Sequence, residues 1–302
     1  MDQAVGLRGL VKGGHNGSGL IGLSDKPIAK NVENNRSIRI ISVTSGKGGV
    51  GKTSVTVNLA LALRYLKKRV LILDADLGLA NMDVMLGLNP KYTISHVLKG
   101  EKRLSDVIIS APGGIKLLPA ASGIQELTDL DSSQKLLLLN ELDMIQDMFD
   151  VFLIDTGAGI SANVMYFNFA AMEKVVIVTN EPTSLTDAYA LIKVLTNKYH
   201  QKRFKVLVNA VRNASEADRI YRNLSLVADK YLGSPSLDYL GWIPYDRMIP
   251  AAIRKQQIFL QTNPETPAGK SIITLARTLM SDKHQSNFEG DVKFFWRRLL
   301  DQ

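Results

Sequence analysis

Short apolar runs alternate with longer amphipathic stretches from Ile38 onward. The apolar runs have the length and β-branched content of buried strands, and they are "IRIISVTS", "RVLILDAD", "IKLLPA", "DVFLIDTG", "KVVIVTN", "FKVLVNA" and "LDYLGWIP". Amphipathic stretches fall between or after them, near 53–66, 134–148, 185–198, 215–231 and 269–280. Buried strands separated by helices indicate a parallel sheet covered on both faces, because each right-handed crossover places its helix on a face. The pattern therefore predicts an α/β fold with a doubly wound, mostly parallel sheet.

Both ends of the chain depart from this pattern. Seven of the 23 glycines fall within the first 22 positions, and the polar run that follows has no period, which is typical of a linker. Near the other end, the polar stretch "SDKHQSNFEGD" precedes "VKFFWRRLLDQ". We predict a flexible segment with a linker at 1–36, one domain at 37–281, and a hinge with a C-terminal amphipathic helix at 282–302.

Composition narrows the classes of function. The chain has 302 residues, 45% of them hydrophobic, which is enough for one large core. It has no cysteine, so disulfides, thiolate zinc sites and cysteine-held iron–sulfur clusters are excluded. No run approaches the roughly 18 apolar residues of a membrane span, and the first residues lack the apolar core of a secretory signal. We expect a cytoplasmic protein whose net charge of +8 suits nucleotide, nucleic acid or a lipid surface.

The strongest chemical signal is "SGKGGVGKTS", which follows an apolar strand and opens a helix. Its glycines let backbone N–H groups turn toward phosphates, Lys52 neutralises β/γ charge, and the Thr53 hydroxyl can ligate Mg²⁺. The plain alternative is a glycine-rich turn with no ligand. The motif predicts that a nucleotide is held by Gly46, Gly48, Gly49, Val50, Gly51, Lys52, Thr53 and Ser54.

Lys47 is unusual, because a lysine directly after the first glycine is not needed to hold phosphate within one subunit. The heptapeptide "KGGVGKT" resembles the deviant Walker A motif of the MinD/ParA family of P-loop NTPases. The resemblance implies an ATP-dependent homodimer in which Lys47 reaches the partner's nucleotide and adds positive charge at the transferring phosphoryl group. The alternative is a lysine solvated at the edge of the loop.

Carboxylates follow two further predicted strands, in "VLILDADLGLANMD" and "VFLIDTGAGIS". In a doubly wound sheet the carboxyl ends of the strands face the ligand crevice. The resemblance implies that Asp76 positions the attacking water and contacts Mg²⁺ through a water, while Asp74 supports the site. Asp155 is expected to hold Mg²⁺ through a water, as a Walker B aspartate does. Capping of the next turn is the structural alternative for Asp74 and Asp76. No catalytic Glu or Gln follows Asp155 in the manner of faster ATPases, so we expect Lys47, Lys52 and Asp76 to support slow hydrolysis.

Base recognition is expected at "VLVNAVRN" and "GWIPYD", the strand ends where relatives in this family bind adenine. These segments nominate the side chain of Asn209 and the backbone from Pro244 to Asp246. Neither matches the N/T-K-x-D guanine signature, so ATP is expected rather than GTP. Ordinary loop residues are the alternative.

The C-terminal stretch has the pattern of an interfacial helix. At about 100° per residue, five apolar side chains share one face, while Lys293, Arg297 and Arg298 lie away from it and Phe294 falls outside it. The cations would each add about 1 kcal/mol near anionic lipid. The alternative is a helix docked on its own domain, and both hold if it docks in the monomer and is released in the dimer. We predict peripheral association with the inner face of the cytoplasmic membrane through Phe288, Val292, Phe295, Trp296 and Leu299.

The first residues, "DQAVGLR" after Met1, resemble the D-Q-A-x-x-L-R segment of the FlhG family, also called FleN or YlxH, whose members control flagellar number and placement. The resemblance implies that this segment binds the GTPase FlhF and stimulates it, with Gln3 entering the active-site region. Gly6 and Gly9 each disfavour a helix by about 1 kcal/mol, so the segment should order only on its partner. The residues nominated for this contact are Asp2, Gln3, Ala4, Leu7 and Arg8.

Two other functions stay open. The chain could be a nucleotide-gated scaffold that docks flagellar C-ring proteins or a flagellar transcription activator. It could also be a ParA-type partition ATPase on non-specific DNA. Sequence-specific nucleic-acid binding is not expected.

Overall fold

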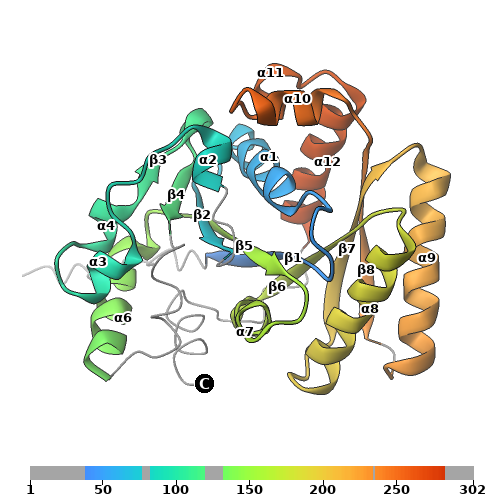
Figure 1. Cartoon of the computed structure of the whole chain (residues 1–302), viewed down its shortest axis with the longest axis horizontal. Coiled ribbons are helices and arrows are strands. Elements are labelled where there is room, and N and C mark those ends of the chain that lie inside the picture. The colour runs from blue at the N-terminus through green and yellow to red at the C-terminus, as the bar shows by residue number, and fades with distance from the viewer. Residues whose placement is uncertain (1–37, 77–81, 120–131, 234, 283–302) are drawn as a thin grey trace, which may run out of the picture. The chain divides into compact units, whose positions relative to one another are not determined.

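The computed structural model describes residues 38–76, 82–119, 132–233 and 235–282. Within them, eight strands form one sheet in the order β3-β4-β2-β5-β1-β6-β7-β8 (Figure 1). Every neighbouring pair is parallel except β3 with β4. The strands are β1 (Arg39–Ser45), β2 (Val70–Ala75), β3 (Ile109–Ser110), β4 (Lys116–Pro119), β5 (Val151–Ala158), β6 (Glu173–Val178), β7 (Arg203–Val211) and β8 (Ser236–Pro244).

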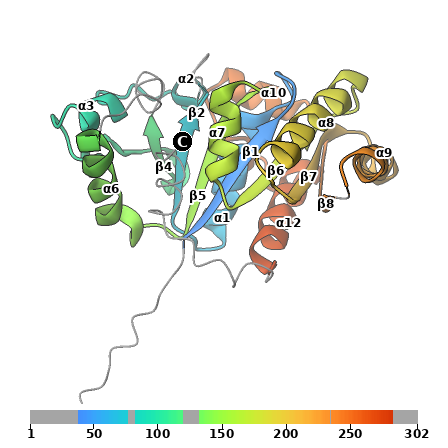
Figure 2. The same ribbon diagram turned by 90° about the horizontal axis from the view of Figure 1, so that it is seen from below.

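Helices cover both faces of this sheet, as Figures 1 and 2 show from two directions. One face carries α1 (Lys52–Tyr65), α2 (Met82–Leu86), α10 (Met248–Arg254), α11 (Phe259–Thr262) and α12 (Pro267–Ser281). The other carries α3 (Ile94–Leu98), α4 (Leu104–Val107), α6 (Ser132–Gln146), α7 (Ala162–Ala170), α8 (Pro182–Asn197) and α9 (Ala214–Tyr231). The 3₁₀ turn η1 (Pro112–Gly114) precedes β4.

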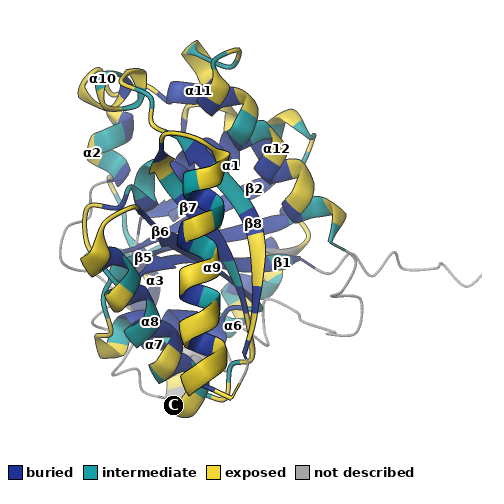
Figure 3. Cartoon of the chain, turned by 90° about the vertical axis from the view of Figure 1, so that its right-hand side faces the viewer, coloured by how far each residue is buried: buried dark blue, intermediate teal, exposed yellow. Residues whose placement is uncertain are grey.

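Successive side chains of a strand point to opposite faces of the sheet, which explains why both faces are covered by helices. Ile41 and Val43 of β1 pack in the core under α1, whereas Ile40, the residue before Ile41, packs in the core on the opposite face. Because both faces are covered, all residues of β2 and β6, and all of β1 except Arg39, are buried, and Figure 3 shows such strands as dark blue arrows between the helices. The period-two placement of side chains thus accounts for apolar runs without polar alternation.

The predicted α/β fold with a doubly wound, mostly parallel sheet is confirmed. All seven predicted strands and all five predicted helices are present, with boundaries shifted by a few residues. The pattern missed the short elements β3, α2, α3, α4, α10 and α11, because segments of two to seven residues are too short to show a period. It also missed α7, whose sequence "ANVMYFNFA" is apolar around most of the helix.

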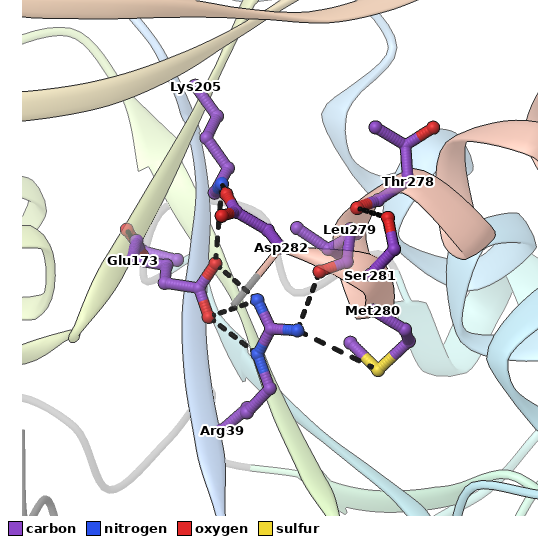
Figure 4. A network of polar contacts seen from close by, with 9 residues as sticks. Arg39, Glu173, Lys205, Thr278, Leu279, Met280, Ser281 and Asp282 are labelled. Atoms are coloured by element: carbon purple, nitrogen blue, oxygen red, sulfur yellow. Dashed lines mark hydrogen bonds and ion pairs between the residues drawn. The ribbon is translucent and has the colours of Figure 1, made fainter. Parts of the chain in front are cut away.

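A network of ion pairs and hydrogen bonds lies at the edge of the sheet where the strands begin (Figure 4). Arg39 donates to both carboxylate oxygens of Glu173 at 2.8 and 2.7 Å, and its third nitrogen donates to the carbonyl of Leu279 at 2.6 Å. Lys205 pairs with Asp282 and lies 3.9 Å from Glu173. Burial raises the pKa of Glu173, although the charge of Arg39 lowers it. The network therefore joins β1, β6 and β7 to the end of α12.

The nominated segments at both ends lie outside the described residues, so Asp2 to Arg8 and Phe288 to Leu299 stay predictions. Among the residues that the structure describes, no helix is both long and apolar enough to cross a membrane.

Candidate nucleotide-binding site

The glycine-rich loop connects β1 to α1 with backbone conformations that glycine supplies. Gly49 and Gly51 have φ angles of 79° and 91°, in the left-handed region. The hydroxyl of Ser45 donates to the carbonyl of Lys47 at 2.6 Å, which fixes the start of the turn. The first turn of α1 contains no acidic residue, and Lys52 is only 7% exposed. The loop therefore presents a lysine and a helix N-terminus, both of which favour anions.

Gly46 lies directly against α8. A Cβ on Gly46 would be 2.0 Å from the backbone carbonyl carbon of Asp187, so no side chain fits between the loop and this helix. This close approach brings the next residue, Lys47, to the first turn of α8. There its Nζ pairs with Glu181 and donates to the hydroxyl of Thr183 at 2.9 Å.

Asp155 fits the role of a Mg²⁺ residue. It is 1% exposed within β5, directly after the strand's apolar run, and its Oδ1 accepts from the Thr56 hydroxyl at 3.3 Å. Thr53 also donates to this carboxylate, which lowers its pKa, but burial dominates and raises the pKa to about 7. Its Oδ2 is buried and has no hydrogen-bond partner among the described residues. A buried carboxylate oxygen beside the Thr53 hydroxyl is a donor set that suits a hard divalent cation, so the residues present fit Mg²⁺.

Asp74 and Asp76 have different surroundings. Asp74 lies opposite Asp155 in the sheet, and its carboxylate accepts from the backbone N–H groups of Asp76 and Met82, both at 3.4 Å. Burial raises the pKa of Asp74 to about 6. Asp76 Oδ1 lies 3.4 Å from the position that a Cβ on Gly157 would take. The Asp74 carboxylate thus accepts from two backbone N–H groups at the end of β2, and the capping alternative and its supporting role are compatible.

Lys52 lies near the two carboxylates expected to act. Burial lowers the pKa of its ammonium, while the charges of Asp155 and Asp76 raise it. The structure therefore brings Lys52, Thr53, Asp76 and Asp155 together at one edge of the sheet, as the sequence predicted. Their roles in binding and catalysis stay predictions.

Beside the loop is a cavity of about 280 Å³. Asn209 lines it, and the side-chain amide donates to the carbonyl of Val50 at 2.8 Å. Pro244 and Asp246 do not line this cavity; they lie at the end of the neighbouring strand, where the Asp246 carboxylate accepts from the N–H of Met248 at 2.8 Å. The cavity residues are Gly49, Val50, Gly51, Thr179, Asn180, Glu181, Asn209 and Ala210.

The segment from Thr179 to Glu181, and the hydrogen bonds that support it, were not predicted from the sequence. The N–H of Thr179 donates to the Ser184 hydroxyl at 3.1 Å, and the amide of Asn180 donates to Glu216. A usable signal existed, because this polar "TNE" directly follows a buried strand. Carboxyl ends of parallel strands meet at one edge of the sheet, so these residues had to lie near the loop.

A doubly wound sheet, a phosphate loop after its first strand and buried carboxylates on the adjoining strand ends define a P-loop NTPase. The AAA domain family model matches residues 38–208, more than half of the chain. The antiactivator FleN of Pseudomonas aeruginosa is 43% identical over 263 residues, covering 87% of this chain and 94% of FleN. The flagellum site-determining protein YlxH of Helicobacter pylori is 33% identical over 271 residues, covering 89% and 92%.

A solved structure extends the comparison. The septum site-determining protein MinD of Pyrococcus horikoshii, complexed with Mg-ADP, is 26% identical with a TM-score of 0.63, covering 82% of this chain and 96% of that one. The chain belongs to the AAA domain family and, within it, to the MinD-like ATPases that include FleN and YlxH. It is an ATPase.

Proposed function

We propose that this ATPase is an ATP- and Mg²⁺-dependent dimerisation switch that regulates the number and placement of flagella. The observation that carries the proposal is that two lysines of one loop have different surroundings. Lys52 is buried beside Asp155, whereas the side chain of Lys47 is 34% exposed and pairs with Glu181. Once it leaves its contact with Glu181, a lysine so placed would be available to a second subunit. The names of two relatives, an antiactivator and a flagellum site-determining protein, support the flagellar role.

Each residue nominated for the nucleotide site then has a role. The loop N–H groups and Lys52 bind the phosphates, and Asn209 with the backbone from Pro244 to Asp246 orients the adenine. Thr53 and Asp155 would hold Mg²⁺, which when bound neutralises phosphate charge and polarises the transferring group. Asp76 orients the attacking water. Lys47 adds charge from the partner subunit.

The terminal segments are the proposed outputs of the switch. Residues 2–8 stimulate FlhF, and the helix at 288–302 attaches the dimer to the inner face of the cytoplasmic membrane. A protein of this kind is cytoplasmic in its monomeric state and peripheral in its dimeric state.

The test combines gel filtration with sedimentation on vesicles. With ATP and Mg²⁺, the wild type and Asp76→Ala should elute as dimers and sediment with anionic vesicles, whereas Lys52→Ala should do neither. Deleting 288–302 should abolish vesicle binding and leave the dimer. Undiminished sedimentation of the truncated chain would refute the membrane role.

The activator role has a separate test. A peptide of residues 1–20 should stimulate GTP hydrolysis by FlhF, and Gln3→Ala should remove the effect. If the protein instead binds non-specific DNA in a salt-dependent manner and ignores vesicles, it acts as a partition-type ATPase. Normal flagellar number in cells carrying Asp76→Ala would favour the scaffold role.

A further inference from the structure

We propose that Glu181 is a positioning residue that holds Lys47 on its own subunit, so that dimerisation must break this ion pair. The inference deepens the proposed function and rests on it, since it requires Lys47 to act across the dimer. In the described structure, the Nζ of Lys47 pairs with Glu181 and donates to Thr183 Oγ1 at 2.9 Å. A lysine engaged in this way is not extended toward a second molecule.

The contact follows from the packing of the loop against α8. Because Gly46 has no side chain, the loop lies against the α8 backbone at Asp187, one turn into the helix. The next residue in the loop then lies beside the N-terminal turn of α8, where Glu181 and Thr183 are. The packing of Gly46 on α8 therefore also determines where Lys47 lies.

Glu181 is held on a fixed support. Directly before it, the side-chain amide of Asn180 donates a hydrogen bond to Glu216 of α9, and the N–H of Thr179 donates to the Ser184 hydroxyl of α8. Glu181 itself occupies the N-cap position of α8, yet its side chain makes no capping hydrogen bond. Its carboxylate is directed to Lys47 instead. When Lys47 leaves, the carboxylate remains beside the N-terminus of α8, which favours a negative charge and offsets part of the loss.

The ion pair between Lys47 and Glu181 is weak, so it disfavours dimerisation without preventing it. The side chains of Lys47 and Glu181 are 34% and 59% exposed, and ion pairs this exposed to solvent are weak. Releasing one lysine should therefore disfavour dimerisation by about two- to fivefold. Two lysines are released per symmetric dimer, so removing both contacts should tighten dimerisation by about 4- to 25-fold.

The experiment measures dimerisation by sedimentation velocity over a range of protein concentrations, with Mg²⁺ and the non-hydrolysable analogue AMPPNP. Glu181→Gln should dimerise at about 4- to 25-fold lower concentration than the wild type. Asp218→Asn is the matched control, because it removes the same charge from an exposed ion pair with Arg222 on α9 and should leave dimerisation unchanged. Equal or weaker dimerisation of Glu181→Gln would overturn the inference.

A double-variant cycle separates this effect from a general change at α8. In a Lys47→Ala background, where dimerisation should be weaker than in the wild type, Glu181→Gln should not tighten it, because the residue that Glu181 holds is gone. Tightening that persists without Lys47 would also overturn the inference. If the wild type does not dimerise, or if Lys47→Ala dimerises as the wild type does, the proposed function itself fails.

Discussion

The side-chain amide of Asn209 donates a 2.8 Å hydrogen bond to the backbone carbonyl of Val50, so the end of β7 is tied directly to the phosphate loop. In the sheet, β6 lies between β7 and β1, the strand that leads into this loop. A Cβ on Gly51 would lie 2.7 Å from the Asn209 nitrogen, so glycine at that position makes room for the contact. A residue expected to recognise the base therefore also orders the loop that receives the phosphates.

Asn209→Asp should weaken nucleotide binding although it keeps the shape of the side chain. A carboxylate cannot donate to the Val50 carbonyl and would repel it, a change of about 1–2 kcal/mol, or roughly 5- to 30-fold in affinity. Titration with a fluorescent ADP analogue measures this effect. Asn223→Asp, which makes the same change at an exposed position of α9, is the control and should bind like the wild type. Equal affinity of both variants would show that the contact does not support the site.

Gly46→Ala should destabilise the nucleotide-free protein, because the new methyl group meets the α8 backbone at 2.0 Å. Neither the loop nor the helix backbone can yield cheaply, so we expect a loss of about 1–3 kcal/mol in the free energy of unfolding. Gly48→Ala is a close control, since a Cβ there meets nothing within 4 Å. Urea unfolding of both variants without nucleotide tests the difference, and equal midpoints would contradict it.

The sequence predicted the strands well because they are buried on both faces, which leaves an apolar run without a helical period. It predicted the phosphate loop because glycine, lysine and threonine occur at fixed spacing between a strand and a helix. It did not predict the contact of Lys47 with Glu181, because 134 residues separate them and only the packing of Gly46 on α8 joins them. Nor did it predict the Arg39–Glu173 pair, because a charge at the start of a buried strand has no motif.

Carboxylate positions were easier to predict than their surroundings. Asp74 and Asp155 each come directly after the apolar run of a strand, and Asp76 directly after β2, so their shared edge follows from topology alone. Which carboxylate caps a turn and which keeps an unpartnered oxygen depends on local backbone geometry. The sequence therefore left the capping alternative open, and in the structure the Asp74 carboxylate accepts from the N–H groups of Asp76 and Met82.

Asp155→Asn should stabilise the nucleotide-free protein at neutral pH while abolishing Mg²⁺-dependent turnover. The pKa of Asp155 is about 7 in the folded protein against an ordinary value of 3.8, so its contribution to stability is present below about pH 4 and is lost as the pH rises to about 7. This loss is on the order of 4 kcal/mol. An amide does not ionise, so the variant should lack most of this decline.

Urea unfolding at about pH 5 and about pH 8, without Mg²⁺ or nucleotide, measures the effect. The stability advantage of Asp155→Asn over the wild type should be larger at the higher pH. Asp229→Asn, on the exposed side of α9, controls for the loss of one charge. A constant difference between Asp155→Asn and the wild type across this range would mean that Asp155 is not the group that titrates.

Arg39→Met should be the most destabilising change to a charged residue outside the nucleotide site. It removes both hydrogen bonds to Glu173, whose side chain is fully buried, and it also removes the donor to the carbonyl of Leu279 at the end of α12. Leaving a buried charge without its partner typically costs about 3–5 kcal/mol. By contrast, Arg222→Met breaks a pair whose side chains are 72% and 49% exposed, so it should change stability by less than about 0.5 kcal/mol.

The dependence on pH identifies the cause. Burial already raises the pKa of Glu173 and Arg39 lowers it, so losing the guanidinium should raise the pKa further. Stability should then fall more steeply in Arg39→Met than in the wild type as the pH rises above the ordinary range of a glutamate, and the loss should be larger at about pH 8 than at about pH 5. Adding Glu173→Gln should recover part of the loss at the higher pH, because the amide stays neutral. If the loss were the same at both pH values and the double variant recovered nothing, the cost would come from the lost packing of the Arg39 side chain instead of from the unpaired carboxylate.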